Sequence, residues 1–243
     1  MVKTYEIVID GVPYIAQHGE YLWDVAKRNG IEIPALCRSN AFAEHRACCR
    51  VCIVEVITRG RSKVVTSCVY PVEGECEVLT NSPKIAQERK VLIALLAARA
   101  PESDVIADMA AQMGATEGYA RLKPLDAGKC ILCGLCVQAC ESMGAGAIST
   151  VNRGVDKEVN TPYGAASDAC IGCLSCANVC PTECIEFTED ADTRTIWNRT
   201  FALVRCKECG QVLGTREMSD VDMCDACRKK ALADEMAQTY RFV

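Results

Sequence analysis

Apolar and polar residues alternate through the first eighty positions in a pattern typical of several strands and one helix. Asp10-Gly11 lies between two alternating runs and predicts a tight two-residue hairpin. Residues 21–29 instead follow helical spacing, and Gly30 ends that helix. The strands are expected over residues 5–9, 12–16, 51–57, 63–68 and 76–79. The pattern therefore predicts a small mixed module of α and β elements.

Helical spacing continues through residues 81–121. Ser82 is suited to cap a helix whose first position is Pro83. This helix is expected to end at Pro101, and a second helix is expected over residues 104–113. No residue of this segment suggests chemistry, so we interpret it as a spacer that packs two modules together.

Cysteine is the unusual component of the composition. The 243 residues include 19 Cys but only two His. The first residues lack a signal-peptide pattern, and C-x-x-C pairs in such a chain favour metal or redox sites over disulfides. The net charge of −5 argues against a nucleic-acid partner, and the longest apolar run, residues 91–98, is too short for membrane insertion. We therefore expect a cytoplasmic protein.

A repeated cysteine motif is the strongest chemical signal in the chain. The run C-x-x-C-x-x-C-x-x-x-C occurs twice, forty residues apart, and Pro181 follows the second copy. The two copies consist of Cys130, Cys133, Cys136 and Cys140, and of Cys170, Cys173, Cys176 and Cys180. In bacterial two-cluster ferredoxins the fourth Cys of each run binds the other cluster.

This spacing predicts two [4Fe–4S] clusters with exchanged fourth ligands. Cluster A is assigned to Cys130, Cys133, Cys136 and Cys180. Cluster B is assigned to Cys140, Cys170, Cys173 and Cys176.

The first module carries a third set of cysteines: Cys37, Cys49, Cys52 and Cys68. Plant-type [2Fe–2S] ferredoxins use three close Cys and one distant Cys, but the first gap is longer here. The longer gap and the segment Cys49-Arg50-Val51-Cys52 resemble the N-terminal ferredoxin-like domain of the large iron–sulfur subunit of respiratory complex I and of iron-only hydrogenases. The resemblance implies a [2Fe–2S] cluster on these four residues in a β-grasp fold. Cys48 remains an alternative to Cys49, although the C-R-x-C register favours Cys49.

The tail has two further C-x-x-C pairs and an exposed helix expected over residues 228–236. The pairs are formed by Cys206, Cys209, Cys224 and Cys227. Paired knuckles of this kind are typical of a structural zinc site, but a third [4Fe–4S] cluster remains open.

Together these motifs predict an α+β chain in four parts. They are a [2Fe–2S] β-grasp domain (1–80), a helical spacer (81–121), a two-[4Fe–4S] ferredoxin-like domain (122–195) and a four-Cys metal-binding tail (196–243). Nucleotide-binding motifs are not evident in the sequence, and between Cys76 and Cys130 neither Cys nor His occurs to build the His-ligated cluster usual in the complex I relatives.

Residues 1–190 resemble the small iron–sulfur subunit that joins diaphorase modules to catalytic subunits in NAD-linked hydrogenases and formate dehydrogenases. The resemblance implies a flavin- and NAD(H)-binding diaphorase-type partner and a catalytic redox partner, with no catalytic residues in this chain. The main hypothesis is thus an electron-transfer subunit of an oxidoreductase complex. An independent ferredoxin-like carrier is the alternative, and an iron–sulfur sensor is less consistent with three clusters.

Overall fold

The chain forms two compact units in a computed structural model that describes residues 3–42, 45–116, 124, 128–218 and 220–240. Unit 1 comprises Met1–Leu135 and Cys180–Cys184, and unit 2 comprises Cys136–Val179 and Ile185–Val243. The division between the units lies within the stretch 122–195, which the cysteine repeat predicts to be one domain. The four predicted domain boundaries stay predictions.

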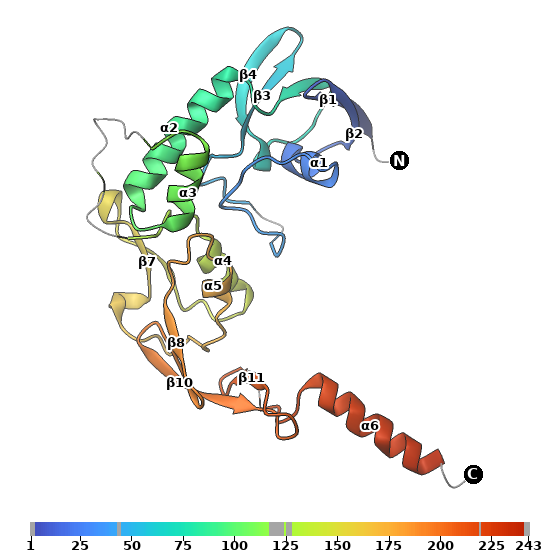
Figure 1. The fold of residues 1–243 in the computed structure, drawn as a ribbon, viewed down its shortest axis with the longest axis vertical. Helices are drawn as coiled ribbons and strands as arrows, with labels where there is room; N and C mark the ends of the chain where they lie inside the picture. The colour runs from blue at the N-terminus through green and yellow to red at the C-terminus, as the bar shows by residue number, and fades with distance from the viewer. Residues whose placement is uncertain (1–2, 43–44, 117–123, 125–127, 219, 241–243) are drawn as a thin grey trace. The chain divides into compact units, whose positions relative to one another are not determined.

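A five-stranded mixed sheet is the centre of unit 1 (Figure 1). Its order is β2-β1-β5-β3-β4, in which β1 and β5 run parallel and the other neighbours run antiparallel. The five expected strands are all present: β1 Thr4–Ile9, β2 Val12–Gln17, β3 Ile53–Thr58, β4 Arg61–Thr66 and β5 Cys76–Leu79. Asp10 and Gly11 both have positive φ, 50° and 85°, as the predicted hairpin turn requires.

Helix α1 (Leu22–Arg28) packs its apolar face against this sheet. Leu22, Val25 and Ala26 are fully buried in the same core as Ile7 and Val54. This helix is the one expected over residues 21–29, and its three buried residues recur at the spacing of one helix face.

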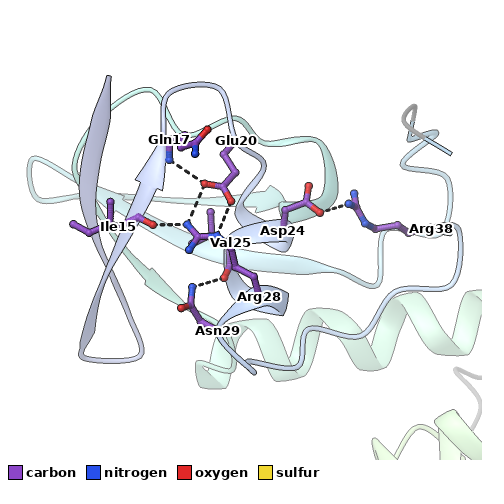
Figure 2. A network of polar contacts seen from close by, with 8 residues as sticks. All are labelled: Ile15, Gln17, Glu20, Asp24, Val25, Arg28, Asn29 and Arg38. Carbon is purple, nitrogen blue, oxygen red and sulfur yellow. Dashed lines mark hydrogen bonds and ion pairs between the residues drawn. The ribbon is translucent and has the colours of Figure 1, made fainter. Parts of the chain in front are cut away.

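A polar network fixes α1 to the strand before it (Figure 2). Arg28 donates to the carboxylate of Glu20 at 2.8 Å and also to the backbone carbonyl of Ile15. The same carboxylate accepts the backbone N–H of Gln17 at 2.9 Å. Arg38, in the loop after α1, is paired with Asp24 on the helix. The network thus holds the loop that leads to Cys37.

Helices α2 (Pro83–Arg99) and α3 (Asp104–Gln112) lie side by side in Figure 1 and correspond to the two expected spacer helices. Ser82 caps α2 by accepting the backbone N–H of Ile85 at 3.3 Å, and Pro83 occupies the first turn as expected. The 3-10 turn η1 (Ser67–Val69) completes the regular elements described in unit 1.

Unit 2 contains a four-stranded antiparallel sheet that the sequence pattern does not predict. Its order is β11-β10-β9-β8, formed by β8 Phe187–Glu189, β9 Thr193–Ile196, β10 Arg199–Arg205 and β11 Val212–Thr215. The remaining elements are α4 Leu135–Ser142, β6 Ser149–Val151, η2 Gly154–Asp156, β7 Glu158–Asn160, η3 Pro162–Gly164, α5 Ser175–Asn178 and α6 Asp225–Tyr240. The exposed helix α6 includes the stretch expected to be helical, residues 228–236.

Candidate iron–sulfur and metal sites

The first candidate site is formed by Cys37, Cys49, Cys52 and Cys68. Cys37 lies in the loop after α1, Cys49 and Cys52 precede β3, and Cys68 lies in η1. All four residues are buried, with at most 3% of their surface exposed. The backbone N–H of Cys49 donates to Sγ of Cys37 at 3.4 Å. This hydrogen bond brings the segment that carries Cys49 and Cys52 against the sulfur of Cys37.

The electrostatics of this site indicate that each of the four sulfurs contacts at least one of the others. Hydrogen bonds from Cys49 and then Cys68 lower the pKa of Cys37 to about 2. Hydrogen bonds with Cys37 and Cys52 raise the pKa of Cys68. Four buried thiols that hydrogen-bond to one another in this way suit a thiolate-bound cluster. Each thiol loses its proton on binding, and a cluster iron atom takes the place of that proton on the sulfur.

Cys48 and Cys49 differ sharply in position although they are adjacent in sequence. Cys49 is 3% exposed and contacts Cys37, whereas Cys48 is an exposed residue whose sulfur faces the backbone carbonyl of Arg46 at 3.4 Å. The geometry therefore groups Cys49, and not Cys48, with the other three sulfurs.

The cysteines assigned to cluster A fall on both sides of the unit division. Cys130, Cys133 and Cys180 belong to unit 1, whereas Cys136 is the first residue of unit 2. Burial raises the pKa of Cys133 to about 12, and the charges of Cys180, Cys130 and Cys37 add to this effect. Within unit 1 the three assigned sulfurs are therefore near neighbours.

Cys184 is also part of this group in unit 1. Its thiol forms a hydrogen bond that lowers the pKa of Cys130 to about 6, and its backbone N–H donates to Sγ of Cys180 at 3.3 Å. Cys184, like Cys48 and Cys76, lies outside the ligand sets that the cysteine spacing predicts.

The cysteines assigned to cluster B line a single cavity in unit 2. Its lining includes Cys140, Cys170, Cys173 and Cys176, with Ala147, Ile196 and Trp197 among the other residues. The backbone N–H of Ala147 donates to Sγ of Cys140 at 3.1 Å. Four sulfurs around one apolar cavity fit a [4Fe–4S] cluster in its donor chemistry and in the grouping that the repeat predicted.

The sheet β8–β11 holds the loop that carries Cys170 and Cys173. Arg199 donates to the carbonyl of Cys170 at 2.8 Å, Thr215 to that of Ile171 at 2.5 Å, and Arg194 to that of Gly172 at 2.7 Å. Three successive backbone carbonyls are thus bound by side chains from three strands. Sequence reasoning missed these residues because isolated Arg and Thr residues have no recognisable spacing.

Gly172 lies in close contact with the same sheet. A Cβ atom at this position would be 2.7 Å from Cδ2 of Phe201, and φ is +67°. Both the space and the backbone conformation therefore require glycine.

The four tail cysteines form a compact sulfur cluster. The sulfurs of Cys206, Cys209, Cys224 and Cys227 all lie within 4.8 Å of one another, and those of Cys209 and Cys224 are 3.8 Å apart. A tetrahedral ion with Zn–S bonds of about 2.3 Å separates its ligand sulfurs by about 3.8 Å. A cubane has an iron atom at each of its four ligated corners and so holds its four thiolates farther apart. The spacing therefore fits one metal ion.

Local backbone geometry explains this arrangement. Cys206 and Cys209 lie in the hairpin between β10 and β11, where the N–H of Cys206 donates to the carbonyl of Gln211 at 2.8 Å. The backbone N–H of Cys224 donates to Sγ of Cys206 at 3.3 Å. Backbone hydrogen bonds from Cys224 and Cys209 lower the pKa of Cys206 to about 6, which favours the thiolate that a metal requires.

Two family models match the parts of the chain that carry the predicted cluster ligands. Residues 3–83 match the model described as a 2Fe-2S iron-sulfur cluster binding domain, and residues 124–187 match the model described as a 4Fe-4S dicluster domain. The chain is an iron–sulfur protein. The expected presence of [2Fe–2S] and [4Fe–4S] sites is thereby confirmed at the level of domains.

Two curated relatives of this iron–sulfur protein are named as subunits of redox enzymes. It is 31% identical to the NADP-reducing hydrogenase subunit HndD of Solidesulfovibrio fructosivorans, over 72% of this chain and 35% of the relative. It is 27% identical to an NADH-quinone oxidoreductase subunit of Rhizobium meliloti, over 84% of this chain and 26% of the relative. The expected relationship to iron–sulfur subunits of such oxidoreductases is confirmed. The chain spans 35% or less of the length of these two relatives.

A solved structure shares the fold over most of the chain. It is a chain of an NAD+-reducing [NiFe]-hydrogenase in the H2-reduced state, with a TM-score of 0.54 and 24% sequence identity, over 65% of this chain and 74% of that chain. In the part of this chain that the structure describes, no helix has both the length and the apolar character needed to cross a membrane.

Proposed function

We propose that the iron–sulfur protein relays electrons between a flavin- and NAD(H)-binding diaphorase-type subunit and a catalytic redox subunit of an oxidoreductase complex. One observation carries the proposal: within unit 1, Gly134, which follows Cys133, lies against the side chain of Arg46, so that a Cβ atom on Gly134 would be 3.0 Å from Cδ of Arg46. Arg46 belongs to the loop between Cys37 and Cys49, so this contact supports a [2Fe–2S] site that adjoins the first [4Fe–4S] site. Adjoining clusters form a path for electrons.

The ligand sets of this proposal are those predicted by the cysteine spacing. Cys37, Cys49, Cys52 and Cys68 hold a [2Fe–2S] cluster in a β-grasp domain, an assignment that the sheet order β2-β1-β5-β3-β4 supports. The [4Fe–4S] ligands are Cys130, Cys133, Cys136 and Cys180 for cluster A and Cys140, Cys170, Cys173 and Cys176 for cluster B. When bound, the clusters supply one-electron redox chemistry, and the chain's own residues bind them as thiolates and exclude water.

We further propose that Cys206, Cys209, Cys224 and Cys227 hold one zinc ion and not a third cluster. The sulfur separations within 4.8 Å support a single tetrahedral ion. Zinc has no redox role, so its function here is to fix the β10–β11 hairpin. A cytoplasmic location belongs to the same proposal, because the proposed sites need reduced thiols.

Metal analysis tests the assignments. Anaerobically purified protein is expected to contain about ten iron atoms and one zinc ion per chain. About fourteen iron atoms without zinc would contradict the zinc assignment, and about two iron atoms would contradict the ferredoxin-like repeat.

Freeze-quench EPR on the native complex tests the relay. After mixing with NADH or NADPH, the [4Fe–4S] signals of this chain are expected to appear within the turnover time. In a Cys49→Ala complex these signals should appear after dithionite but not after the nicotinamide. Signals that never respond to a nicotinamide would overturn the proposal, and purification of the native chain as a monomer would favour the alternative of an independent ferredoxin-like carrier.

A further inference from the structure

Trp197 occupies an unusual backbone position at the edge of the cavity lined by the cluster B cysteines. It forms a two-residue turn with Asn198 between β9 and β10, and the flanking residues Ile196 and Arg199 are paired across the turn. Both turn residues have positive φ, 52° for Trp197 and 59° for Asn198. Glycine or asparagine normally fills such positions, and a bulky side chain there is rare.

The side chain of Trp197 is directed to a cluster ligand. Its indole Nε1–H donates to Sγ of Cys176, with the two heavy atoms 3.5 Å apart, and the residue lines the cavity. Burial raises the pKa of Cys176 to about 11, and the Trp197 hydrogen bond acts in the opposite direction because it stabilises the thiolate.

Neighbouring contacts hold the turn in this position. Asn198 donates to the carbonyl of Gly164 at 3.3 Å. Arg199 donates from Nη1 to the carbonyls of Asp168 and Cys170, both at 2.8 Å. The indole is therefore placed by a turn whose residues are bound to two other segments of unit 2.

We propose that Trp197 raises the reduction potential of cluster B by donating an N–H···S hydrogen bond to Cys176. The inference rests on the proposed ligand set of cluster B. A reduced cluster carries one more negative charge, part of which resides on the ligand sulfurs, so the hydrogen bond is stronger in the reduced state. The bond therefore raises the potential, and its loss lowers it.

Trp197→Phe is the decisive variant, because it keeps an aromatic ring and removes the N–H donor. The chain offers a matched control in its second tryptophan, Trp23, whose indole donates to the backbone carbonyl of Ile33 at 2.9 Å in unit 1. Trp23→Phe removes the same donor without touching cluster B.

An EPR-monitored redox titration of the full chain, purified anaerobically, tests the proposal. The midpoint potential of cluster B is expected to fall in Trp197→Phe, whereas the other two clusters keep theirs and Trp23→Phe leaves cluster B unchanged. An unchanged cluster B potential in Trp197→Phe, or an equal shift of all clusters, would overturn the inference. The signal of cluster B is identified as the one that is lost in Cys173→Ser. If that variant keeps both [4Fe–4S] signals, the proposed ligand set of cluster B is wrong, and the role of Trp197 is not what has failed.

A second measurement needs no variant at Trp197. In chain labelled with ¹⁵N-indole tryptophan, pulsed EPR of reduced cluster B is expected to detect a ¹⁵N coupling that persists in Trp23→Phe. Absence of the coupling in the unsubstituted chain would equally refute the role of Trp197.

Discussion

Arg89 of α2 donates from Nη2 to the backbone carbonyl of Ile53, with 2.6 Å between the two atoms. The same guanidinium donates to the carbonyls of Val51 at 3.1 Å and of Thr80 at 2.8 Å, and Arg89 is only 7% exposed. Burial lowers the pKa of Arg89, while the charges of Cys52 and Asp10 favour the cation. Val51 and Ile53 flank the proposed ligand Cys52, so a spacer helix supports the [2Fe–2S] site directly.

Arg89→Met is expected to destabilise unit 1, because three buried carbonyl groups lose their donor. The expected loss is roughly 2–4 kcal/mol, since each buried unsatisfied group costs about 1–3 kcal/mol and some relaxation occurs. The measurement is the thermal midpoint at which the visible circular dichroism of the [2Fe–2S] cluster disappears. Arg99→Met, at the end of the same helix, serves as the comparison, and an equal effect of the two changes would contradict the special role of Arg89.

Substitution of Cys48 and Cys49 separates the two candidate ligands. Cys49→Ser is expected to abolish or strongly alter the [2Fe–2S] EPR signal, because Cys49 is buried against Cys37. Cys48→Ser should leave the signal and the iron content unchanged, because Cys48 is exposed. The reverse outcome would move the ligand assignment to Cys48.

Gly172→Ala is expected to cost cluster B while sparing the other clusters. The new methyl group would meet the ring of Phe201 at 2.7 Å, in addition to the strain of an αL backbone, which costs about 1–2 kcal/mol. Gly154→Ala is the matched control, since its φ of +64° is similar and no heavy atom lies within 4 Å of the added Cβ. Iron analysis and EPR of both variants measure the difference, and equal iron loss in both would attribute the effect to backbone strain alone.

Cys227→Ser is expected to remove zinc and leave the iron content at about ten per chain. Loss of the zinc ion should also make the β10–β11 hairpin sensitive to limited proteolysis, because the metal no longer joins the hairpin to the segment that begins at Cys224. Cys76→Ser, at a half-buried cysteine of β5, should leave both metals in place. Loss of four iron atoms per chain, roughly, in Cys227→Ser would instead indicate a cubane in the tail.

The network around Glu20 predicts a pH dependence of stability. Partial burial acts to raise the pKa of Glu20, but the hydrogen bonds from Arg28 and Gln17 outweigh it, so the pKa lies below its ordinary value. A carboxyl with a lowered pKa stabilises the fold above its unfolded pKa of about 4.3 and loses this contribution as the pH falls through the folded value. The difference in thermal midpoint between the unsubstituted chain and Glu20→Gln is therefore expected to be full above about pH 5 and to narrow as the pH falls below about 4.

Glu6→Gln provides the control for this experiment. Glu6 is an exposed residue of β1 with no ion pair among the described residues, so its substitution should shift the thermal midpoint little across the pH range. A constant difference for Glu20→Gln across the range would refute the proposed contribution of its ionised form.

The features that could be predicted from the sequence are those encoded by neighbouring residues. The hairpin at Asp10-Gly11, the cap at Ser82 and the helical face of α1 depend on contacts within a few positions. Cysteine spacing likewise reports local loops, and the structure places Cys140 and Cys170, which the spacing assigns to one cluster, at the same cavity.

The features that could not be predicted depend on distant contacts. Thr215 binds the carbonyl of Ile171, 44 positions away, and Arg89 binds that of Val51, 38 positions away. Strands β8, β9 and β11 have only three or four residues each, and the role of the sheet that they form with β10 is visible only once it packs on the cysteine loop. The division into units is equally hidden, because Cys180–Cys184 belongs to unit 1 although the segments on both sides of it along the chain belong to unit 2.

The discontinuous path of the chain also bears on its synthesis. During translation, the first 135 residues emerge well before Cys180–Cys184, which complete unit 1. The loop at Cys170–Gly172 receives its last side-chain support only when Thr215 has left the ribosome. Both [4Fe–4S] clusters are thus expected to be inserted after nearly the whole polypeptide has left the ribosome, and not during elongation. A chain truncated after residue 190 would keep all eight repeat cysteines but would lack the side chains that support the loop of cluster B.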